Sequence, residues 1–316
     1  MQPQIVFLDR DTLNVPLRPV SNRHQWVGYT QTRPEETAER LKDATVAITN
    51  KVAINAAILQ HTPKLKLIAV AATGYNNIDI AACKKHGVTV CNVRDYALTG
   101  VAEHALMLML ALRRQLLAYR ADLQAGAWQK ATGFCLLDHP IHDLNGSTLT
   151  LIGGGALGRS LANMAKGLGM RIIFAEHKNV PTVRPGYVLF NDALAKADVV
   201  SLHCPLTEET RHLIGAKEFA LMKPSAILIN TARGGIVDEK ALLAALQNHQ
   251  LAGAGVDVLA EEPPRHGNLL LDVDLPNLIV TPHIAWAGEE TMLQLAEQLI
   301  GNVEAFLNGE ARNIVS

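Results

Sequence analysis

The stretch Leu149-Thr150-Leu151-Ile152-Gly153-Gly154-Gly155-Ala156-Leu157-Gly158 decides the fold of this 316-residue chain. A mostly apolar segment, typical of a buried strand, runs directly into the pattern GxGxxG, and helix-forming residues follow. Gly153 permits a tight turn, Gly155 lets the backbone approach a pyrophosphate, and Gly158 allows a helix to pack closely on the strand. The stretch therefore predicts a dinucleotide-binding domain built on a parallel sheet.

The residues beside this motif bear on the cofactor. Backbone N–H groups at Ala156 and Leu157, where the helix begins, would point toward the phosphates. The next predicted strand ends at Glu176. An acid there can accept hydrogen bonds from the adenosine ribose and would repel a 2′-phosphate, so NAD is favoured over NADP. His177 and Lys178 follow directly, and a cation at either position could instead accommodate the phosphate. A glycine-rich turn without any ligand is the alternative interpretation, which the strand, helix and acid together disfavour.

Short apolar strands alternate with helical segments on both sides of the motif. The predicted strands are 5–8, 46–49, 67–71, 88–91, 148–152, 171–175, 199–201, 226–230, 255–258 and 278–280. Strand–helix alternation implies parallel sheets with helices on their faces. The predicted fold class is therefore α/β, with two Rossmann-like parallel-sheet domains, a cleft between them, and boundaries near residues 100 and 285. We also expect one long helix over 101–127, an irregular segment over 129–145 and a closing helix over 289–307.

Composition excludes several classes of protein. The 29 Lys+Arg residues balance 30 Asp+Glu to a net charge of −1, which leaves no broad electrostatic footprint for nucleic acid or an acidic membrane. The apolar run 105–112 is too short to span a membrane, and the apolar stretch 5–8 is too short for a signal peptide. Four cysteines without CxxC spacing predict neither a disulfide framework nor a metal site. We expect a cytoplasmic protein with no nucleic-acid or membrane partner.

Four ionisable residues in the second half fall where a Rossmann domain binds ligands. Arg233 follows an apolar strand, and its guanidinium can clamp a carboxylate with two parallel hydrogen bonds. Asp257 lies inside a predicted strand, Glu262 precedes two prolines, and His283 follows the last predicted strand. Taken singly, each has a structural alternative: a surface arginine, a capping aspartate, a loop glutamate and a packing histidine. Together they supply the cation, the proton donor and the orienting carboxylate that hydride transfer to a 2-oxo acid needs.

The order of these motifs resembles the D-isomer-specific 2-hydroxyacid dehydrogenase family. The resemblance covers nearly the whole chain. Its motifs are GxGxxG, Asn-Thr-Ala-Arg-Gly-Gly at 230–235, Asp-x-x-x-x-Glu-Pro at 257–263, Pro-His-Ile at 282–284, and the segments 72–79 and 101–104. The resemblance implies a split arrangement. Residues 1–100 and 286–316 would form an outer substrate domain, and residues 101–285 an inserted NAD-binding Rossmann domain.

The resemblance also implies roles for individual residues. His283 would be the acid/base, paired with Glu262, and Arg233 would hold the carboxylate and carbonyl oxygen of the substrate. Asp257 would lie near the nicotinamide. The remaining implied contacts are Cys204, Pro205, Thr231, Ala232 and Arg233 with the cofactor, and Thr73 and Gly74 with the substrate carboxylate. Trp286 offers an indole N–H to a substrate hydroxyl, with an aromatic buried between the two domains as the alternative.

Within the family, the segments 134–141 and 282–286 resemble glycerate dehydrogenases, also called hydroxypyruvate reductases. The expected reaction interconverts a small 2-oxo acid and its D-2-hydroxy acid, with hydroxypyruvate and D-glycerate preferred. A D-lactate-type enzyme, a glyoxylate reductase, or a formate or phosphite dehydrogenase stays open. From another class, so does a dinucleotide-sensing protein like the C-terminal-binding corepressors. A long disordered tail would distinguish that class, and the sequence shows none. The family and the segment 129–145 suggest a homodimer.

Overall fold

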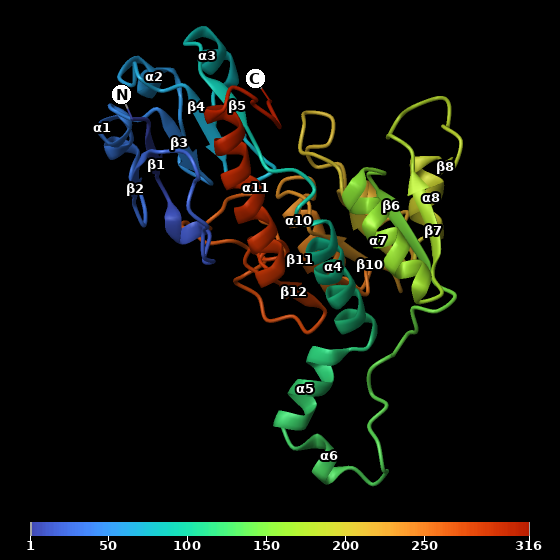
Figure 1. Ribbon diagram of the computed structural model, residues 1–316. Coiled ribbons are helices and arrows are strands. Elements are labelled where there is room, and N and C mark those ends of the chain that lie inside the picture. Colours follow the sequence, from blue (N-terminus) through green and yellow to red (C-terminus); the bar gives the residue numbers. More distant parts are fainter. Residues whose placement is uncertain (1, 316) are drawn as a thin grey trace. The chain divides into compact units, whose positions relative to one another are not determined.

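The computed structural model describes residues 2–315 (Figure 1). Within that range the chain forms two compact units. The first unit combines the chain up to Ala97 with the segment from Ala287 onward, and the second unit is Leu98–Trp286. The first unit is therefore discontinuous in sequence.

Among the described residues, the first unit holds a five-stranded sheet in the order β2-β1-β3-β4-β5, and every pair is parallel. Its strands are β1 (Gln4–Phe7), β2 (Gln25–Gly28), β3 (Val46–Thr49), β4 (Leu67–Val70) and β5 (Thr89–Cys91). Its helices are α1 (Thr37–Leu41), α2 (Ala56–Gln60), α3 (Ile80–Lys85) and α11 (Glu289–Leu307). Helix α11 packs against β4, so the end of the chain completes the unit that its beginning starts.

In the part of the chain that the structure describes, the second unit contains a seven-stranded parallel sheet ordered β12-β11-β10-β9-β6-β7-β8. Its strands are β6 (Thr148–Ile152), β7 (Arg171–Ala175), β8 (Tyr187–Val188), β9 (Val199–Leu202), β10 (Ile227–Asn230), β11 (Gly253–Val256) and β12 (Leu278–Val280). The order reverses at β6, the strand that leads into the glycine motif. This parallel strand order confirms the predicted Rossmann-like fold. Ligands of open α/β sheets bind where the strand order reverses.

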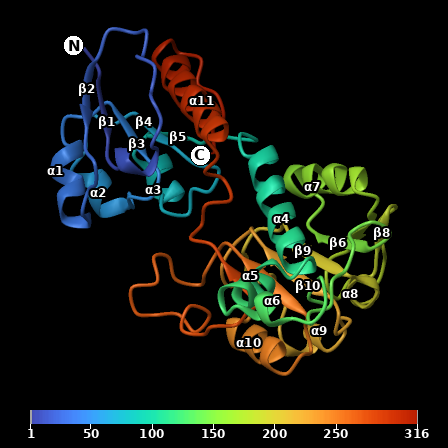
Figure 2. The same ribbon diagram turned by 90° about the horizontal axis from the view of Figure 1, so that it is seen from below.

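Helices cover both faces of the seven-stranded sheet (Figure 2). On one face, α4 (Leu98–Arg113) and α7 (Ala156–Gly167) pack on an apolar cluster. On the other, α8 (Phe190–Lys196), α9 (Ala216–Phe219) and α10 (Glu239–Gln247) pack on a second cluster. Because both faces are buried, the strands β6, β9, β10 and β11 are buried at every residue. None of the described helices is long and apolar enough to cross a bilayer.

The single long helix predicted over 101–127 is wrong. The fully described stretch instead contains α4, α5 (Leu116–Gln124) and α6 (Ala127–Lys130). The breaks fall at Gln115, with φ 55°, and Gly126, with φ 71°, because a left-handed residue cannot continue a right-handed helix. Residues 116–141, here called the arm, extend away from the sheet of the second unit (Figure 1).

Candidate active site

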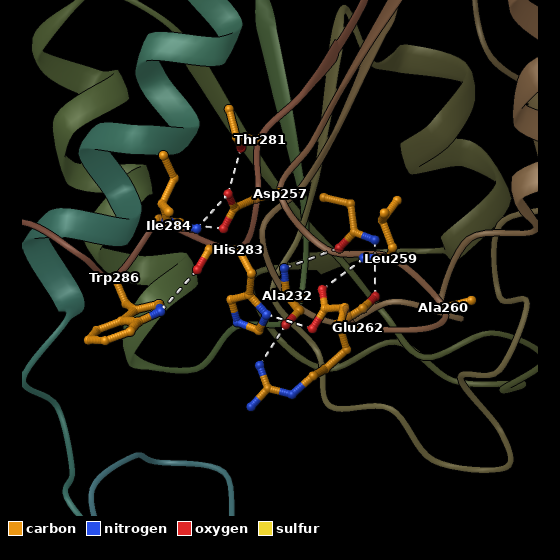
Figure 3. Close-up of polar contacts among 12 residues, drawn as sticks. Ala232, Asp257, Leu259, Ala260, Glu262, Thr281, His283, Ile284 and Trp286 are labelled. Carbon is orange, nitrogen blue, oxygen red and sulfur yellow. Dashed lines mark hydrogen bonds and ion pairs between the residues drawn. The ribbon is translucent and has the colours of Figure 1, made fainter. Parts of the chain in front are cut away.

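His283 and Glu262 lie in contact in the second unit (Figure 3). The ring Nδ1 of His283 is 2.7 Å from Oε2 of Glu262. The other carboxylate oxygen, Oε1, accepts the backbone N–H of Leu259 at 2.9 Å, so the carboxylate is held from both sides. With a carboxylate on Nδ1, that nitrogen carries the proton, and Nε2 is left to exchange a proton with a ligand.

A buried aspartate holds the loop that carries His283. Asp257 is 1% exposed. It comes directly after the last residue of β11, whereas the sequence predicted that it lies inside the strand. Its Oδ1 accepts from the Thr281 hydroxyl at 2.5 Å and from the Ile284 N–H at 2.9 Å, and its Oδ2 accepts from the Ala285 N–H at 2.9 Å. His283 itself has φ 56°, and its N–H donates to the Asp257 carbonyl at 2.9 Å. These bonds offset the cost of the left-handed conformation, about 1–2 kcal/mol.

The sequence did not assign His104 of α4 to this loop. Its Nε2 lies 3.0 Å from the Thr281 hydroxyl oxygen and 3.5 Å from Oδ1 of Asp257. The single hydroxyl proton of Thr281 goes to Asp257, so His104 must be the donor in its contact with Thr281. His104 therefore connects α4 to the loop. The segment 101–104, one of the motifs that resemble the family, includes His104. Its contact with Thr281, however, becomes visible only in the folded structure.

Trp286 packs as part of the same loop. Its indole Nε1–H donates to the carbonyl of His283 at 3.0 Å. An indole has a single N–H donor. The hydroxyl-binding role that the sequence suggested for that donor therefore does not fit this structure, in which the donor is used within the chain.

Arg233 lies on the turn after β10, at the carboxyl end of the sheet. Asn230 shapes this turn: its Oδ1 accepts the Ala232 N–H at 3.1 Å, and its Nδ2 donates to the Arg233 carbonyl at 3.0 Å. Nη1 of Arg233 donates to the Ala232 carbonyl at 2.6 Å. A Cβ on Gly234 would lie 1.8 Å from the carbonyl oxygen of Leu259. Glycine is therefore required there, because the turn of Arg233 packs directly on the loop that holds Glu262.

The glycine motif forms a loop between β6 and α7. Gly153 has φ 110°, and a Cβ there would lie 2.5 Å from the carbonyl of His203. A Cβ on Gly158 would lie 2.2 Å from the carbonyl oxygen of Gly153, whereas one on Gly155 would meet no atom within 4 Å. Helix α7 begins after Gly155. Because glycine has no side chain, this residue caps none of the first backbone N–H groups of the helix. Two glycines thus permit close packing, while the third leaves open space before a helix N-terminus, as a phosphate site requires.

Buried polar atoms without a partner lie at neighbouring strand ends. Among the described residues, neither the Thr231 hydroxyl nor Nδ1 of His203 has a hydrogen-bond partner. Thr231 follows β10, and His203 follows β9 and touches the glycine loop. Burial lowers the pKa of His203 to about 4 and raises the pKa of the adjacent Cys204 thiol to about 11, so both are neutral at pH 7. Pro205 comes next in the chain and is exposed.

Glu176 is the residue directly after β7, and its carboxylate already has a partner. Arg184, which the sequence did not single out, forms an ion pair with its carboxylate at 2.7 Å. This hydrogen bonding lowers the pKa of Glu176 to about 2. Lys178, the cation that the sequence placed beside Glu176, pairs instead with Glu218 at 2.7 Å.

Thr73 and Gly74 lie in the first unit, on the turn after β4. The Thr73 hydroxyl donates to the Val93 carbonyl at 2.9 Å, and the Thr73 carbonyl accepts from Asn92 at 2.7 Å. Their contact with a substrate stays a prediction. In the second unit, hydrogen bonds connect His283 to both Glu262 and Asp257. The turn that carries Arg233 and Gly234 packs beside the loop that holds Glu262. Within residues 2–315 no group of three or more His, Cys, Asp or Glu side chains is placed to hold a metal ion.

Comparison with known proteins gives the family. The family described as D-isomer specific 2-hydroxyacid dehydrogenase, NAD binding domain, matches residues 106–285. A glycerate dehydrogenase of Methylorubrum extorquens is 49% identical over 316 residues, covering 100% of this chain and 99% of that protein. The chain belongs to the D-isomer specific 2-hydroxyacid dehydrogenase family. It is thus an NAD-dependent enzyme that interconverts a 2-oxo acid and a D-2-hydroxy acid.

Other members are less similar in sequence but cover much of the chain. A glyoxylate reductase of Thermococcus litoralis is 41% identical over 83% of this chain and 80% of its own length. The solved structure of D-2-hydroxyisocaproate dehydrogenase has a TM-score of 0.83 at 27% identity, covering 99% of both chains. The NAD-complexed D-isomer specific 2-hydroxyacid dehydrogenase of Lactobacillus delbrueckii has a TM-score of 0.78 at 26% identity, covering 99% of this chain and 100% of its own. The open glycine loop and the unpartnered atoms beside it fit the cofactor of this family.

Proposed function

We propose that this dehydrogenase reduces hydroxypyruvate to D-glycerate reversibly, with glyoxylate as a secondary substrate. The contact between His283 and Glu262 carries the proposal that the second unit performs acid–base chemistry. The choice of 2-oxo acid is supported by the 49% identical relative, which is named glycerate dehydrogenase and matches over its whole length.

His283 is the proton donor and acceptor in this proposal. NAD, when bound, supplies or accepts the hydride at the carbon that bears the reacting oxygen. Nε2 of His283 gives a proton to the carbonyl oxygen in reduction and removes it in oxidation. Glu262 stabilises the protonated ring through Nδ1 and fixes its orientation. The Leu259 N–H holds Glu262 in turn, so the ring does not need to reorganise during the reaction.

Arg233 is proposed to hold the substrate carboxylate. Its exposed guanidinium uses Nη1 on the Ala232 carbonyl, which orients the group and leaves the rest of the planar fork for a ligand. We further assign the remaining predicted residues to binding. The proposed cofactor contacts are Gly153, Gly155, Ala156, Leu157, Gly158, Glu176, Cys204, Pro205, Thr231, Ala232, Arg233 and Asp257, and the proposed substrate contacts are Thr73, Gly74, Arg233, His283 and Trp286. Trp286 is assigned through packing instead of its N–H.

A panel of 2-oxo acids tests the substrate. We expect hydroxypyruvate to exceed pyruvate in kcat/KM by at least roughly tenfold, because the 49% identical relative is named glycerate dehydrogenase and an enzyme specific for that product discriminates against the analogue that lacks its hydroxyl. Steady-state NADH oxidation with hydroxypyruvate, glyoxylate and pyruvate measures the ratio. If pyruvate equals hydroxypyruvate, the enzyme is of the D-lactate type and the proposed substrate is wrong.

Replacing Glu262 tests its pairing with His283. In the Glu262→Gln variant, the amide carries no charge to stabilise the imidazolium that forms when the ring holds the transferred proton. We expect kcat to fall by at least about tenfold in both directions, since a hydrogen bond to a charged group contributes about 1.5–3 kcal/mol. Steady-state assays of hydroxypyruvate reduction and D-glycerate oxidation measure the loss, and equal kcat values in parent and variant would refute the pairing.

The two units are proposed to have different binding roles. The second unit, which includes the family's NAD-binding region, binds the cofactor, and the first unit supplies Thr73 and Gly74 as the outer substrate domain. We place the enzyme in the cytoplasm, where nicotinamide dinucleotides are available and thiols stay reduced. All four cysteines are free, and Cys83 and Cys91 are buried.

The arm is proposed to form a homodimer. It exposes large apolar side chains that a monomer would leave in water, above all Phe134 at 91% and Leu137 at 81% exposed. A second copy of the same surface would bury them in a symmetric contact. We expect sedimentation to give twice the chain mass, and the double variant Phe134→Asp, Leu137→Glu to sediment as a monomer. A parent that sediments as a monomer at micromolar concentration would contradict this.

A further inference from the structure

The carboxylate of Glu176 is already bound within the chain. Oε1 accepts from Nη2 of Arg184 at 2.7 Å, and Oε2 accepts from Nε of Arg184 at 2.8 Å. The backbone N–H of His177 donates to Oε1 at 2.8 Å, and that of Arg184 to Oε2 at 3.0 Å. Glu176 is 3% exposed, whereas the Arg184 side chain is 54% exposed. A guanidinium therefore lies on the solvent side of the acid expected to receive the adenosine ribose.

Arg184 contacts the residue that follows β7, next to the strand that leads into the glycine loop. Strand β7, which ends before Glu176, pairs with β6, which ends before the loop. Tyr187 of β8 packs against the loop, because a Cβ on Gly154 would lie 2.1 Å from its hydroxyl oxygen. The Cζ atom of Arg184 lies 4.1 Å from the centre of the Tyr187 ring. Stacking on this ring and pairing with Glu176 together hold the guanidinium beside the dinucleotide loop.

The balance of charge at this edge favours an anion. Arg184 neutralises Glu176, and Arg159 adds a second guanidinium, whose Nε donates to the Gly154 carbonyl at 2.9 Å. Lys178 adds little positive charge at this edge, because it forms an ion pair with the buried Glu218. An unpaired Glu176 would repel a 2′-phosphate, but the pair presents the cation outward.

We infer that Arg184 lets this enzyme bind a 2′-phosphorylated dinucleotide as well as NAD. The guanidinium moves from Glu176 to the 2′-phosphate, which it can meet with two parallel hydrogen bonds. Glu176 tolerates the loss, because the N–H groups of His177 and Arg184 still donate to its two oxygens. The inference rests on the dinucleotide site and not on the identity of the 2-oxo acid, so the two can fail separately.

Binding without turnover tests the inference. The probes are adenosine 2′,5′-bisphosphate and AMP, titrated calorimetrically into the full-length enzyme. We expect the bisphosphate to bind the parent at least as tightly as AMP. In the Arg184→Ala variant, the ratio of the two dissociation constants should shift against the bisphosphate by at least about tenfold, since a charge-assisted hydrogen bond is lost. The kcat/KM ratio for NADPH and NADH should shift in the same direction.

Further variants separate charge from loop structure. Arg184→Gln can still hydrogen-bond Glu176 and keep the loop in place, so it should lose the bisphosphate preference as Arg184→Ala does. Arg114→Ala removes an equally exposed arginine of the same unit, paired with Asp143 at 2.8 Å, and should leave the ratio unchanged. The inference is overturned if the parent does not bind the bisphosphate, or if Arg184→Gln and Arg184→Ala weaken both probes equally.

Discussion

Replacing His283 with alanine is expected to lower kcat for hydroxypyruvate reduction by ~10²–10⁴-fold, the usual contribution of a positioned proton donor. His283 also has φ 56°, which alanine adopts at a cost, so the loop itself could shift. The variant His283→Asn removes the proton donor but tolerates the left-handed conformation. Both variants should lose the same activity, as measured by stopped-flow NADH oxidation at saturating substrate.

The chain supplies a matched control for this experiment. His266 contacts Glu261 through Nδ1 at 2.8 Å, the same kind of pair as His283 with Glu262, but its side chain is 84% exposed. His266→Ala should therefore leave kcat within about twofold, as surface substitutions usually do. If His283→Asn retained more than a tenth of the parent activity, the acid–base role would belong to another residue.

Arg233→Ala is expected to lower kcat/KM by about 10²–10⁴-fold, because it removes two charge-assisted hydrogen bonds of roughly 1.5–3 kcal/mol each. Arg233→Lys keeps the charge but loses the planar fork, so it should recover only part of the loss. The diagnostic measurement compares pyruvate with its methyl ester. The parent should strongly prefer the acid, and Arg233→Ala should abolish most of that preference.

Arg114→Lys, which alters an exposed arginine on the Asp143 ion pair, controls for a general effect of the substitution. If Arg233→Lys were as active as the parent, Arg233 would be an ordinary surface residue. If Arg233→Ala lost activity equally on the acid and the ester, its role would be to shape the turn and not to bind the carboxylate.

The elements that the sequence predicted well are those whose burial is complete. The strands β6, β9 and β10 are mostly apolar and buried at every residue, since a parallel sheet covered on both faces leaves no side exposed to water. Strand β2 was missed because it is an edge strand that is mostly exposed, and β8 because it has two residues. The break after α4 depends on Gln115, a residue that has no special preference for the left-handed conformation, so no local pattern indicated it.

For the site, chemistry was more predictable than contacts. The identity of the acid/base candidate followed from the motifs around His283, and the family supplied Glu262 as its partner. The contacts of His104 with Thr281 and of Arg184 with Glu176 are set by how distant segments pack. The same is true of Trp286, whose N–H could be read as a free donor until the fold placed the His283 carbonyl beside it.

The discontinuous first unit has a consequence for how the protein is made. Its sheet is synthesised before the second unit, but α11, which packs on β4 with Leu295, Leu299 and Val303 buried, is synthesised after it. The amide of Asn302 on this helix also donates to the Asn92 carbonyl, closing the end of the sheet. The segment Leu98–Trp286 is complete before α11 emerges and can fold during translation as one unit. The sheet of the first unit therefore has to wait, with the face that α11 covers still open, until the whole second unit has been synthesised.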